Sequence, residues 1–382
     1  MDNRLVSSGF SALERQLGGR LAAGCGPVSR GMFELARRHR VHLLLASSMT
    51  RAERARPDWT DVARELRTAA ALDAVRERQV QALLTALLAA GIDVLLLKGI
   101  ALAYIVYPAP HLRPRADIDV MIRREAIDQT ERVLAARGWT RPTEREAELS
   151  AAQRHYVRSG PRGTLQHLDV HWKIANPQTF ANALAFDDLR ARAVHIPALG
   201  PGAWTLSPPD ALFLACLHRI AHHDDALHML WLWDIHLLCR GLSAAEADRV
   251  VALADRSAMW SICRRSLDLA GGLFGTPGAY ALATRLGARA VGVPEPSARF
   301  IGGAKQVSVL RADLAAMSRW RDRLTLLGEH VFPSVAYMRT AYPRCPSLLL
   351  PLAYAYRIAA GTPKWFRRPP ANRSAPPTQR RD

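Results

Sequence analysis

The sequence predicts an α+β fold in which a small mixed sheet lies between an N-terminal helical region and a helical C-terminal domain. Three observations lead to this fold class. Residues 1–90 carry apolar side chains at spacings of three and four, which is typical of helices. Short apolar runs alternate with a helix and a hairpin between residues 92 and 173, as in a small α/β domain. Helical patterns return after residue 203 and continue to residue 360.

The individual elements follow from local patterns along the chain. "ELARRHRVHLLLASSM" and a long segment ending in "QALLTALLAAG" predict helices, and Gly91 is a suitable residue to end the second one. "IDVLLLK" predicts a short strand, a helix begins near Gly99, and a proline-rich loop leads to a second strand, "ADIDVMI". "REAIDQTERVLAARGW" predicts an amphipathic helix that Gly138 ends. "QRHYVRS", the turn "GPRG" and "TLQHLDVHWK" predict a hairpin.

The C-terminal half begins with a clear helix start, in which Ser207 caps a helix whose first positions are prolines. Two apolar helices split around "HHDD" follow. We therefore expect four regions. These are an N-terminal helical region (1–82), an α/β domain (83–202), a helical domain that closes over the substrate (203–361), and a disordered basic tail rich in proline and arginine (362–382).

Composition restricts the classes of function. The net charge is +18, but only four of the 52 basic residues are lysine, and the arginines are spread along the chain, so the charge reads as a compositional bias. We therefore expect neither nucleic acid nor a membrane as a partner, because no apolar run is long enough to span a bilayer. Five scattered cysteines favour reduced thiols and a cytoplasmic protein.

Two carboxylates in the strand "ADIDVMI" carry the functional argument. Alternation places Asp117 and Asp119 on one face of the strand, opposite Ile118 and Val120. Such carboxylates repel each other unless a cation lies between them, and Mg²⁺ takes carboxylate and phosphate oxygens together. A solvated polar strand face would show the same spacing.

The second strand of the hairpin favours a metal site over a solvated strand face. Alternation in "TLQHLDVHWK" places His167, Asp169, His171 and Lys173 on one face. If this strand lies beside "ADIDVMI", Asp169 becomes a third carboxylate, and the three could hold two Mg²⁺ ions. Asp169 is also the best-placed base for an acceptor hydroxyl. The histidines either contact phosphate or orient Asp169.

At this point the sequence resembles a known family. The segments "LLLKGIALAYIVYP", "RPRADIDVMI" and "LDVHW" occur in the order found in a bacterial branch labelled uncharacterised nucleotidyltransferase, within the DNA polymerase β-like nucleotidyltransferase superfamily. The resemblance covers roughly residues 83–240 and implies a polymerase β-like catalytic domain. It implies further that the catalytic and metal-binding residues are Asp117, Asp119 and Asp169, and that the nucleotide is bound by Lys98, Gly99, Arg113, His171 and Lys173.

Other candidate residues lie downstream. His218 and His222 share a helical face near His223, which is compatible with zinc, although a polar helix end beside the cleft is the more common meaning. Asp234 lies on an otherwise apolar helix and therefore needs a partner. The aromatic cluster around Trp231 fits the core better than a role in adenine stacking.

Three functions remain open from the sequence. The first is a Mg²⁺-dependent nucleotidyltransferase that moves a nucleoside monophosphate from an NTP, with ATP expected, to a hydroxyl or similar group. Relatives that lie beside natural-product and lasso-peptide gene clusters suggest a peptide or small-molecule acceptor. The second is a kinase that attacks the γ-phosphate from the same site. The third is a catalytically silent module that binds a polyanion.

Overall fold

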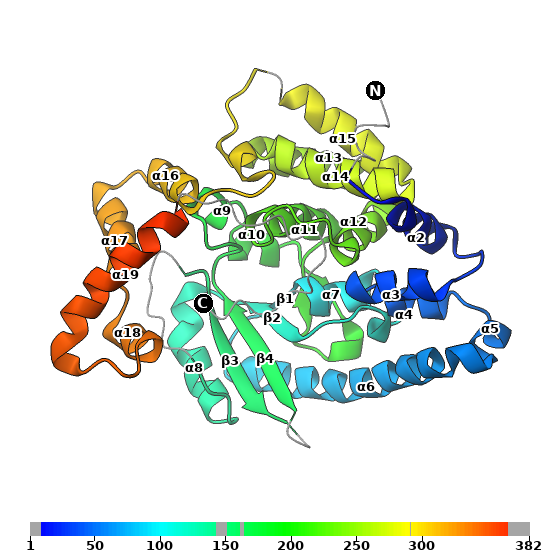
Figure 1. Ribbon diagram of the computed structural model, residues 1–382, viewed down its shortest axis with the longest axis horizontal. Helices are drawn as coiled ribbons and strands as arrows, with labels where there is room; N and C mark the ends of the chain where they lie inside the picture. Colours follow the sequence, from blue (N-terminus) through cyan, green and yellow to red (C-terminus); the bar gives the residue numbers. More distant parts are fainter. Residues whose placement is uncertain (1–8, 143–150, 161–163, 291, 366–382) are drawn as a thin grey trace.

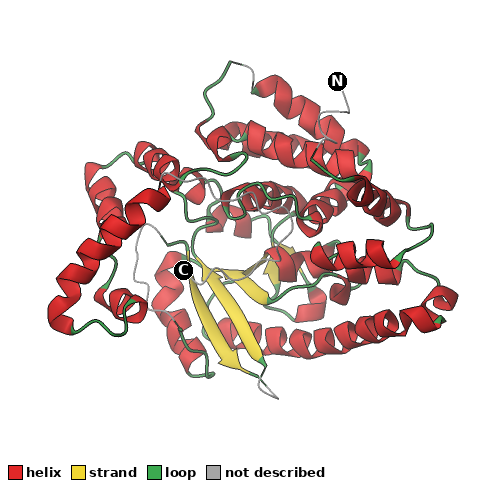
Figure 2. Ribbon diagram, in the orientation of Figure 1, coloured by secondary structure: helices red, strands yellow, loops and turns green. Residues whose placement is uncertain are grey.

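The computed structural model describes residues 9–142, 151–160, 164–290 and 292–365. Its six-stranded mixed sheet has the order β3-β4-β2-β1-β6-β5, with helices on both faces (Figures 1 and 2). The strands are β1 (Leu95–Leu97), β2 (Asp117–Met121), β3 (Gln153–Ser159), β4 (Leu165–His171), β5 (Val194–His195) and β6 (Trp204–Thr205). The predicted α+β fold class is confirmed.

The pairing of β2 with its neighbours fixes the geometry of the predicted site. β2 runs parallel to β4, so that Asp119 lies opposite Asp169, and antiparallel to β1, so that Asp119 also lies opposite Leu97. β3 and β4 form the predicted hairpin, in which His155 lies opposite Asp169. Most of its predicted turn, residues 161–163, falls outside the described residues. The two strands with carboxylates are therefore direct neighbours in the sheet.

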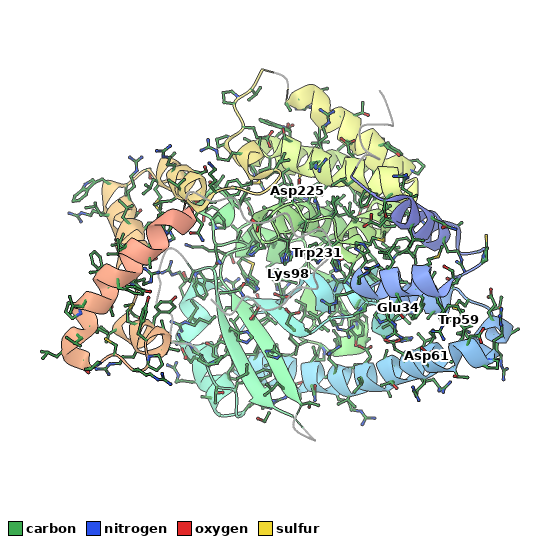
Figure 3. The ribbon with its side chains drawn as sticks, viewed as in Figure 1. Glu34, Trp59, Asp61, Lys98, Asp225 and Trp231 are labelled. Carbon is green, nitrogen blue, oxygen red and sulfur yellow. The ribbon has the colours of Figure 1, made fainter. Side chains whose placement is uncertain are left out.

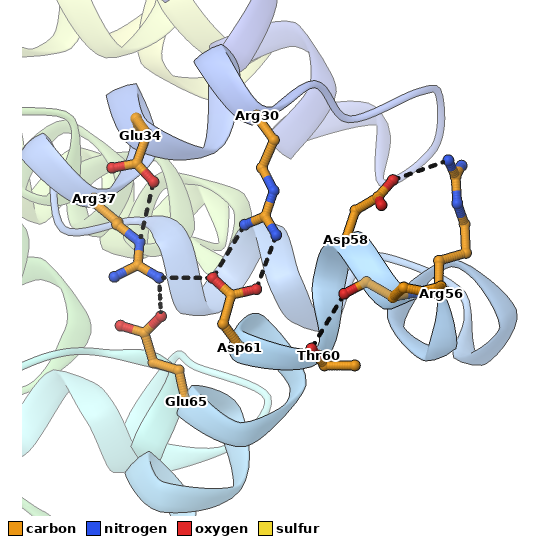
Figure 4. A network of polar contacts seen from close by, with 9 residues as sticks. Arg30, Glu34, Arg37, Arg56, Asp58, Thr60, Asp61 and Glu65 are labelled. Carbon is orange, nitrogen blue, oxygen red and sulfur yellow. Dashed lines mark hydrogen bonds and ion pairs between the residues drawn. The ribbon is translucent and has the colours of Figure 1, made fainter.

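The N-terminal region is helical; its first helix packs against the C-terminal bundle and its last helix packs against the sheet. Its elements are α2 (Ala12–Ala23), α3 (Arg30–Arg38), α4 (His42–Ser47), α5 (Arg51–Ala55), the 3-10 turn η1 (Pro57–Trp59) and α6 (Thr60–Ala89). Arg30 bonds Asp61 at 2.9 Å and Arg37 bonds Glu65 at 2.7 Å, so that α3 is tied to the start of α6 (Figure 4). The 30-residue α6 runs across residue 82, where the sequence suggested a boundary.

Helices and turns between the strands complete the α/β part of the molecule. They are α7 (Lys98–Ile105), η2 (Pro110–Leu112), η3 (Arg124–Ala126), α8 (Ile127–Ala135), α9 (Gln178–Ala181), α10 (Phe186–Arg190) and η5 (Pro197–Leu199). The sheet continues to β6, which lies just beyond residue 202, and the division into domains stays a prediction.

The C-terminal helices form a bundle over the sheet and a projecting group (Figure 1). The bundle contains α11 (Pro208–Ala221), α12 (Met229–Gly241), α13 (Ala244–Ser257), α14 (Trp260–Phe274) and α15 (Pro277–Arg289). The projecting group contains η6 (Pro296–Phe300), α16 (Gln306–Ala316), α17 (Trp320–Val331), α18 (Val335–Ala341), η7 (Ser347–Leu349) and α19 (Leu350–Trp365). Residues 366–382 of the predicted tail lie outside the described residues. Among the described helices, none is long and apolar enough to cross a membrane.

The two faces of the sheet pack against different layers. The face of β2 that carries Ile118 and Val120 belongs to a buried cluster with residues of α6 and α8. Leu97 and Met121, on the opposite face, belong to a cluster with residues of the α11–α15 bundle. Asp119 pairs with Leu97 and lies two residues before Met121, so its side chain is on the same face and is directed toward the helical bundle.

Candidate active site

The carboxylates of two adjacent parallel strands come together on the face that is directed toward the bundle. Oxygens of Asp119 and Asp169 and a ring nitrogen of His171 all lie within 4.8 Å of one another, a group that could hold a metal ion. Asp117 lies on the same face, two residues before Asp119, with His167 as its partner on β4. It is not a member of the close group.

Lys98 follows the last residue of β1 and places its side chain on the same carboxylates. Its backbone has a φ of 50°, a left-handed conformation that is uncommon for a residue with a side chain. The ammonium group donates to Oδ1 of Asp119 at 2.9 Å, and Nε2 of His171 lies 2.9 Å from the same oxygen. His171 is buried and Lys98 is partly buried, and this three-residue contact is the centre of the site.

Charge within the site is unevenly distributed. Burial acts to lower the pKa of Lys98, but the charges of Asp119, Asp169 and Asp117 outweigh it and raise the pKa above its usual value. Burial acts to raise the pKa of Asp119, but Lys98 and His171 hold it well below its usual range. Burial, together with the neighbouring carboxylates, raises the pKa of Asp117 to about 6. Asp117 therefore takes up a proton more readily than an ordinary aspartate.

Asp169 is oriented by the first strand of the hairpin. His155 lies with Nδ1 2.6 Å from Oδ1 of Asp169, and Gln153 donates to Oδ2 at 3.0 Å. The hydrogen bond to Asp169 is the largest cause of the raised pKa of His155. The ring of His155 stacks on that of His167, with centroids 5.3 Å apart. The sequence pointed to His167 but not to His155, although the hairpin that places His155 opposite Asp169 was visible in it.

Arg113 bonds to Asp234 of α12 and not to the carboxylates of β2 and β4. Its guanidinium donates to both oxygens of Asp234 on α12, at 2.9 and 2.6 Å, and Tyr107 donates to the same carboxylate at 2.7 Å. All of these side chains are buried. The partner that Asp234 was expected to need is thus Arg113. The predicted binding of the nucleotide by Arg113 stays a prediction. In this structure Nε and Nη2 of its guanidinium both donate to Asp234.

Gly99 and Lys173 have different surroundings. A Cβ atom on Gly99 would lie 2.5 Å from Nη1 of Arg113, so this position requires a residue without a side chain. Lys173 lies two residues beyond the end of β4, and its backbone N–H donates to the carbonyl of Ala152 at 3.3 Å. Lys98 therefore contacts the carboxylate group, and Lys173 lies in the loop that follows β4.

A wall of aromatic rings lies near Lys98, made by His218 of α11, by His222 and His223 just after it, and by Trp231 of α12. The ring of His223 stacks on Trp231 with centroids 3.9 Å apart, and His218 stacks on His222 at 5.1 Å. Burial, followed by the charge of Lys98, lowers the pKa of His222 to about 3 and also lowers the pKa of His218, so these two imidazoles are neutral near pH 7. In Figure 3, Lys98 and Trp231 both lie in the layer between the sheet and the bundle.

The zinc interpretation of these histidines receives no support from the described residues, where the close ligand group is the one around Asp119. Trp231 itself is only partly buried, whereas Trp233 is in the core. The turn that carries the wall is anchored by Asp225, which has a φ of 60° and bonds Arg219 at 2.5 Å and Arg265 at 3.2 Å. These ion pairs fix the turn that follows α11.

A comparison with family models agrees with this geometry. A model described as uncharacterised nucleotidyltransferase matches residues 30–275, from the first residue of α3 to the end of α14. The chain belongs to this family. The match confirms the resemblance and extends it to the N-terminal helices α3–α6. Membership supports nucleotidyl transfer as the general class of reaction. No curated protein matches the chain.

Proposed function

We propose that the protein is a Mg²⁺-dependent enzyme that transfers a nucleoside monophosphate from an NTP, ATP in the first instance, to a hydroxyl or similar group of a peptide or small molecule. The observation that carries the proposal is the register of β2 and β4. It sets Asp119 directly beside Asp169 on one face, with Lys98 in contact with the first of them. Rigid neighbouring strands are a suitable support for metal ligands.

The residues present fit a magnesium site. Asp119 and Asp169 offer carboxylate oxygens, which Mg²⁺ prefers, and His171 lies within the same group. Asp117 forms no ion pair with a described residue and lies next to them on the strand, where it would help to hold a second ion. A bound Mg²⁺ would polarise the α-phosphate and align the leaving pyrophosphate. Lys98 balances the charge of Asp119 when no metal is bound.

Residues of the protein accept the proton of the acceptor hydroxyl and orient the carboxylate that receives it. In the proposed reaction the acceptor oxygen forms a bond to the α-phosphorus, and the bond between that phosphorus and the bridging oxygen breaks, which releases pyrophosphate. The acceptor proton passes to the carboxylate of Asp169, which His155 and Gln153 hold in place. Lys98 contributes positive charge at the edge of the strand where phosphates would lie.

The test is transfer of label from ATP to material in a host extract in the presence of Mg²⁺. We expect label from the α position to appear in an acceptor, and we expect an Asp119→Asn variant to transfer about 1000-fold less. An Asp188→Asn variant, which removes an exposed carboxylate of α10, is the matched control. Transfer of the γ label alone would show a kinase and contradict the proposal, as would equal α transfer by wild type and Asp119→Asn.

A further inference from the structure

Two of the arginines that lie near Asp117 already have bonded counter-ions. Arg113 donates two hydrogen bonds to the carboxylate of Asp234, and Arg115 pairs with Asp73 of α6 while it also donates to the carbonyl of Pro110 at 2.8 Å. Both guanidinium groups are buried. Their positive charges are therefore balanced within the fold, and neither is free to meet a ligand without breaking a buried pair.

Two further arginines in the same place have no such partners. Arg40 and Arg76 form no ion pair and no side-chain hydrogen bond with any described residue. Arg40 precedes α4, which packs on η2, the turn that leads directly into Arg113. Arg76 lies one helical turn after Asp73 on α6, and hence on the same side of that helix. Both side chains are partly buried.

The backbone holds Arg40 in a fixed and unfavourable conformation. Its φ is 57°, in the left-handed region where a side chain normally costs about 1 kcal/mol. Hydrogen bonds from Arg40 N to Arg37 O at 3.0 Å and from Val41 N to Ala36 O at 2.9 Å close the turn. The neighbouring His39 is buried and lies 3.0 Å from Glu14. The position of Arg40 is therefore set by the fold and does not depend on a partner for its side chain.

The electrostatic surroundings of Arg40 are those of a group that lacks a counter-ion. Burial, followed by the charge of Arg113, lowers its pKa, and Arg76 acts in the same direction. Asp117 and Asp234 act in the opposite direction without bonding to it. Clustered guanidinium groups that are partly removed from water are costly unless an anion joins them. This cost makes the place suitable for a phosphate, which a guanidinium can bind through two parallel hydrogen bonds.

We propose that Arg40 and Arg76 form an anion site beside Asp117 that takes the β- and γ-phosphates of the nucleotide. The inference rests on the proposed function, because it is the α-phosphate at the carboxylate group that would bring the other two phosphates to this side. It assigns the binding of phosphate, which the resemblance implied for Arg113, to two residues of the N-terminal region. Arg113 then acts by holding α12 against η2 through Asp234.

The test measures the affinity of the full chain for tripolyphosphate and for ATP, each with Mg²⁺, by isothermal titration calorimetry. Arg40→Gln and Arg76→Gln should each weaken both ligands by about 10-fold, as expected for loss of one charged hydrogen-bonding partner. Arg38→Gln is the matched control because it removes the same charge from an exposed position two residues away. It should change either affinity by no more than about 2-fold.

A second variant separates binding from folding. Arg40→Gly removes the unpaired charge and places glycine where the left-handed backbone is unstrained, so it should raise the midpoint of thermal unfolding while it weakens tripolyphosphate binding. A lower midpoint would show that Arg40 is structural and overturn the inference. Unchanged tripolyphosphate binding by Arg40→Gln and Arg76→Gln, or an equal loss in Arg38→Gln, would also overturn it, even if α-label transfer is intact. Wild-type protein that binds neither ligand would overturn the proposed function as well.

Discussion

At the scale of single residues, the site depends on a close approach between Gly99 and Arg113. The guanidinium of Arg113 passes so near to Gly99 that no Cβ atom fits between them, and its bonds to Asp234 prevent it from moving aside. Gly99 follows Lys98, whose left-handed backbone turns the chain from β1 into α7. The Lys-Gly pair thus serves two contacts, one with Asp119 and one with Arg113.

Replacement of Gly99 by alanine tests this contact. Gly99→Ala should lower the free energy of unfolding by about 1–3 kcal/mol, the usual cost of forcing extra atoms into a packed site. Gly19→Ala is the matched control, because Gly19 is an exposed residue inside α2 with nothing within 4 Å of a new Cβ, and alanine there should add about 0.5–1 kcal/mol. Urea denaturation measures both. Equal stability of Gly99→Ala and wild type would show that the site has more room than the structure indicates.

At the scale of secondary-structure elements, the hairpin of β3 and β4 supports the carboxylate face. β4 supplies Asp169 and His171, and β3 supplies the two side chains that orient Asp169. These two side chains are His155 and Gln153, and the ring of His155 is held in place by its stack on His167. Metal-site carboxylates held by such outer contacts bind and react more effectively than free ones.

His155 should therefore affect the reaction without touching the nucleotide. His155→Phe keeps a ring against His167 but loses the hydrogen bond, and we expect nucleotide transfer to fall by about 10-fold. His155→Asn, whose amide can donate to Asp169, should recover part of the loss. Initial rates of α-label transfer provide the measurement, and His195→Phe, on the edge strand β5, is the control. Wild-type rates in His155→Phe would show that orientation of Asp169 by His155 does not contribute to the reaction.

The sequence predicted those parts of the site that depend on alternation along one strand. Asp119 and Asp169 were identified because each lies in a strand with a regular apolar face, and only the pairing of those strands remained to be seen. The bond between Arg113 and Asp234 could not be predicted, because 121 residues separate its members and nothing local specifies their distance. Arg40 was not identified, because nothing in the local sequence places it near Arg113 and Asp117. His155 was within reach, since a hairpin register counted back from the turn pairs it with Asp169.

At the scale of the whole molecule, several buried histidines couple folding to pH. Burial is the main cause that lowers the pKa of His228 to about 3, of His222 to about 3 and of His236 to about 4. All three therefore stay neutral in the folded chain at pH values where an unfolded histidine, with a pKa near 6.5, is protonated. Their contribution to stability is complete above about pH 6.5 and is lost as pH falls toward the folded values.

His228→Gln tests this linkage at the least exposed of these positions. Wild-type stability should fall between pH 6 and pH 4, and the variant should show a slope that is smaller by about 1 kcal/mol per pH unit. Denaturant unfolding at several pH values gives the slope, so a constant loss of stability in the variant does not disturb the comparison. Parallel curves for wild type and His228→Gln would contradict a neutral His228.

The most direct measurement of the central claim is the product released from ATP during turnover with Mg²⁺ and the host extract. The geometry of Asp119, Asp169 and Lys98 predicts that wild-type protein releases pyrophosphate. It predicts also that Asp169→Asn releases at least about 100-fold less, while Asp188→Asn behaves as wild type. Release of inorganic phosphate in place of pyrophosphate, or pyrophosphate release that survives in Asp169→Asn, would contradict the account.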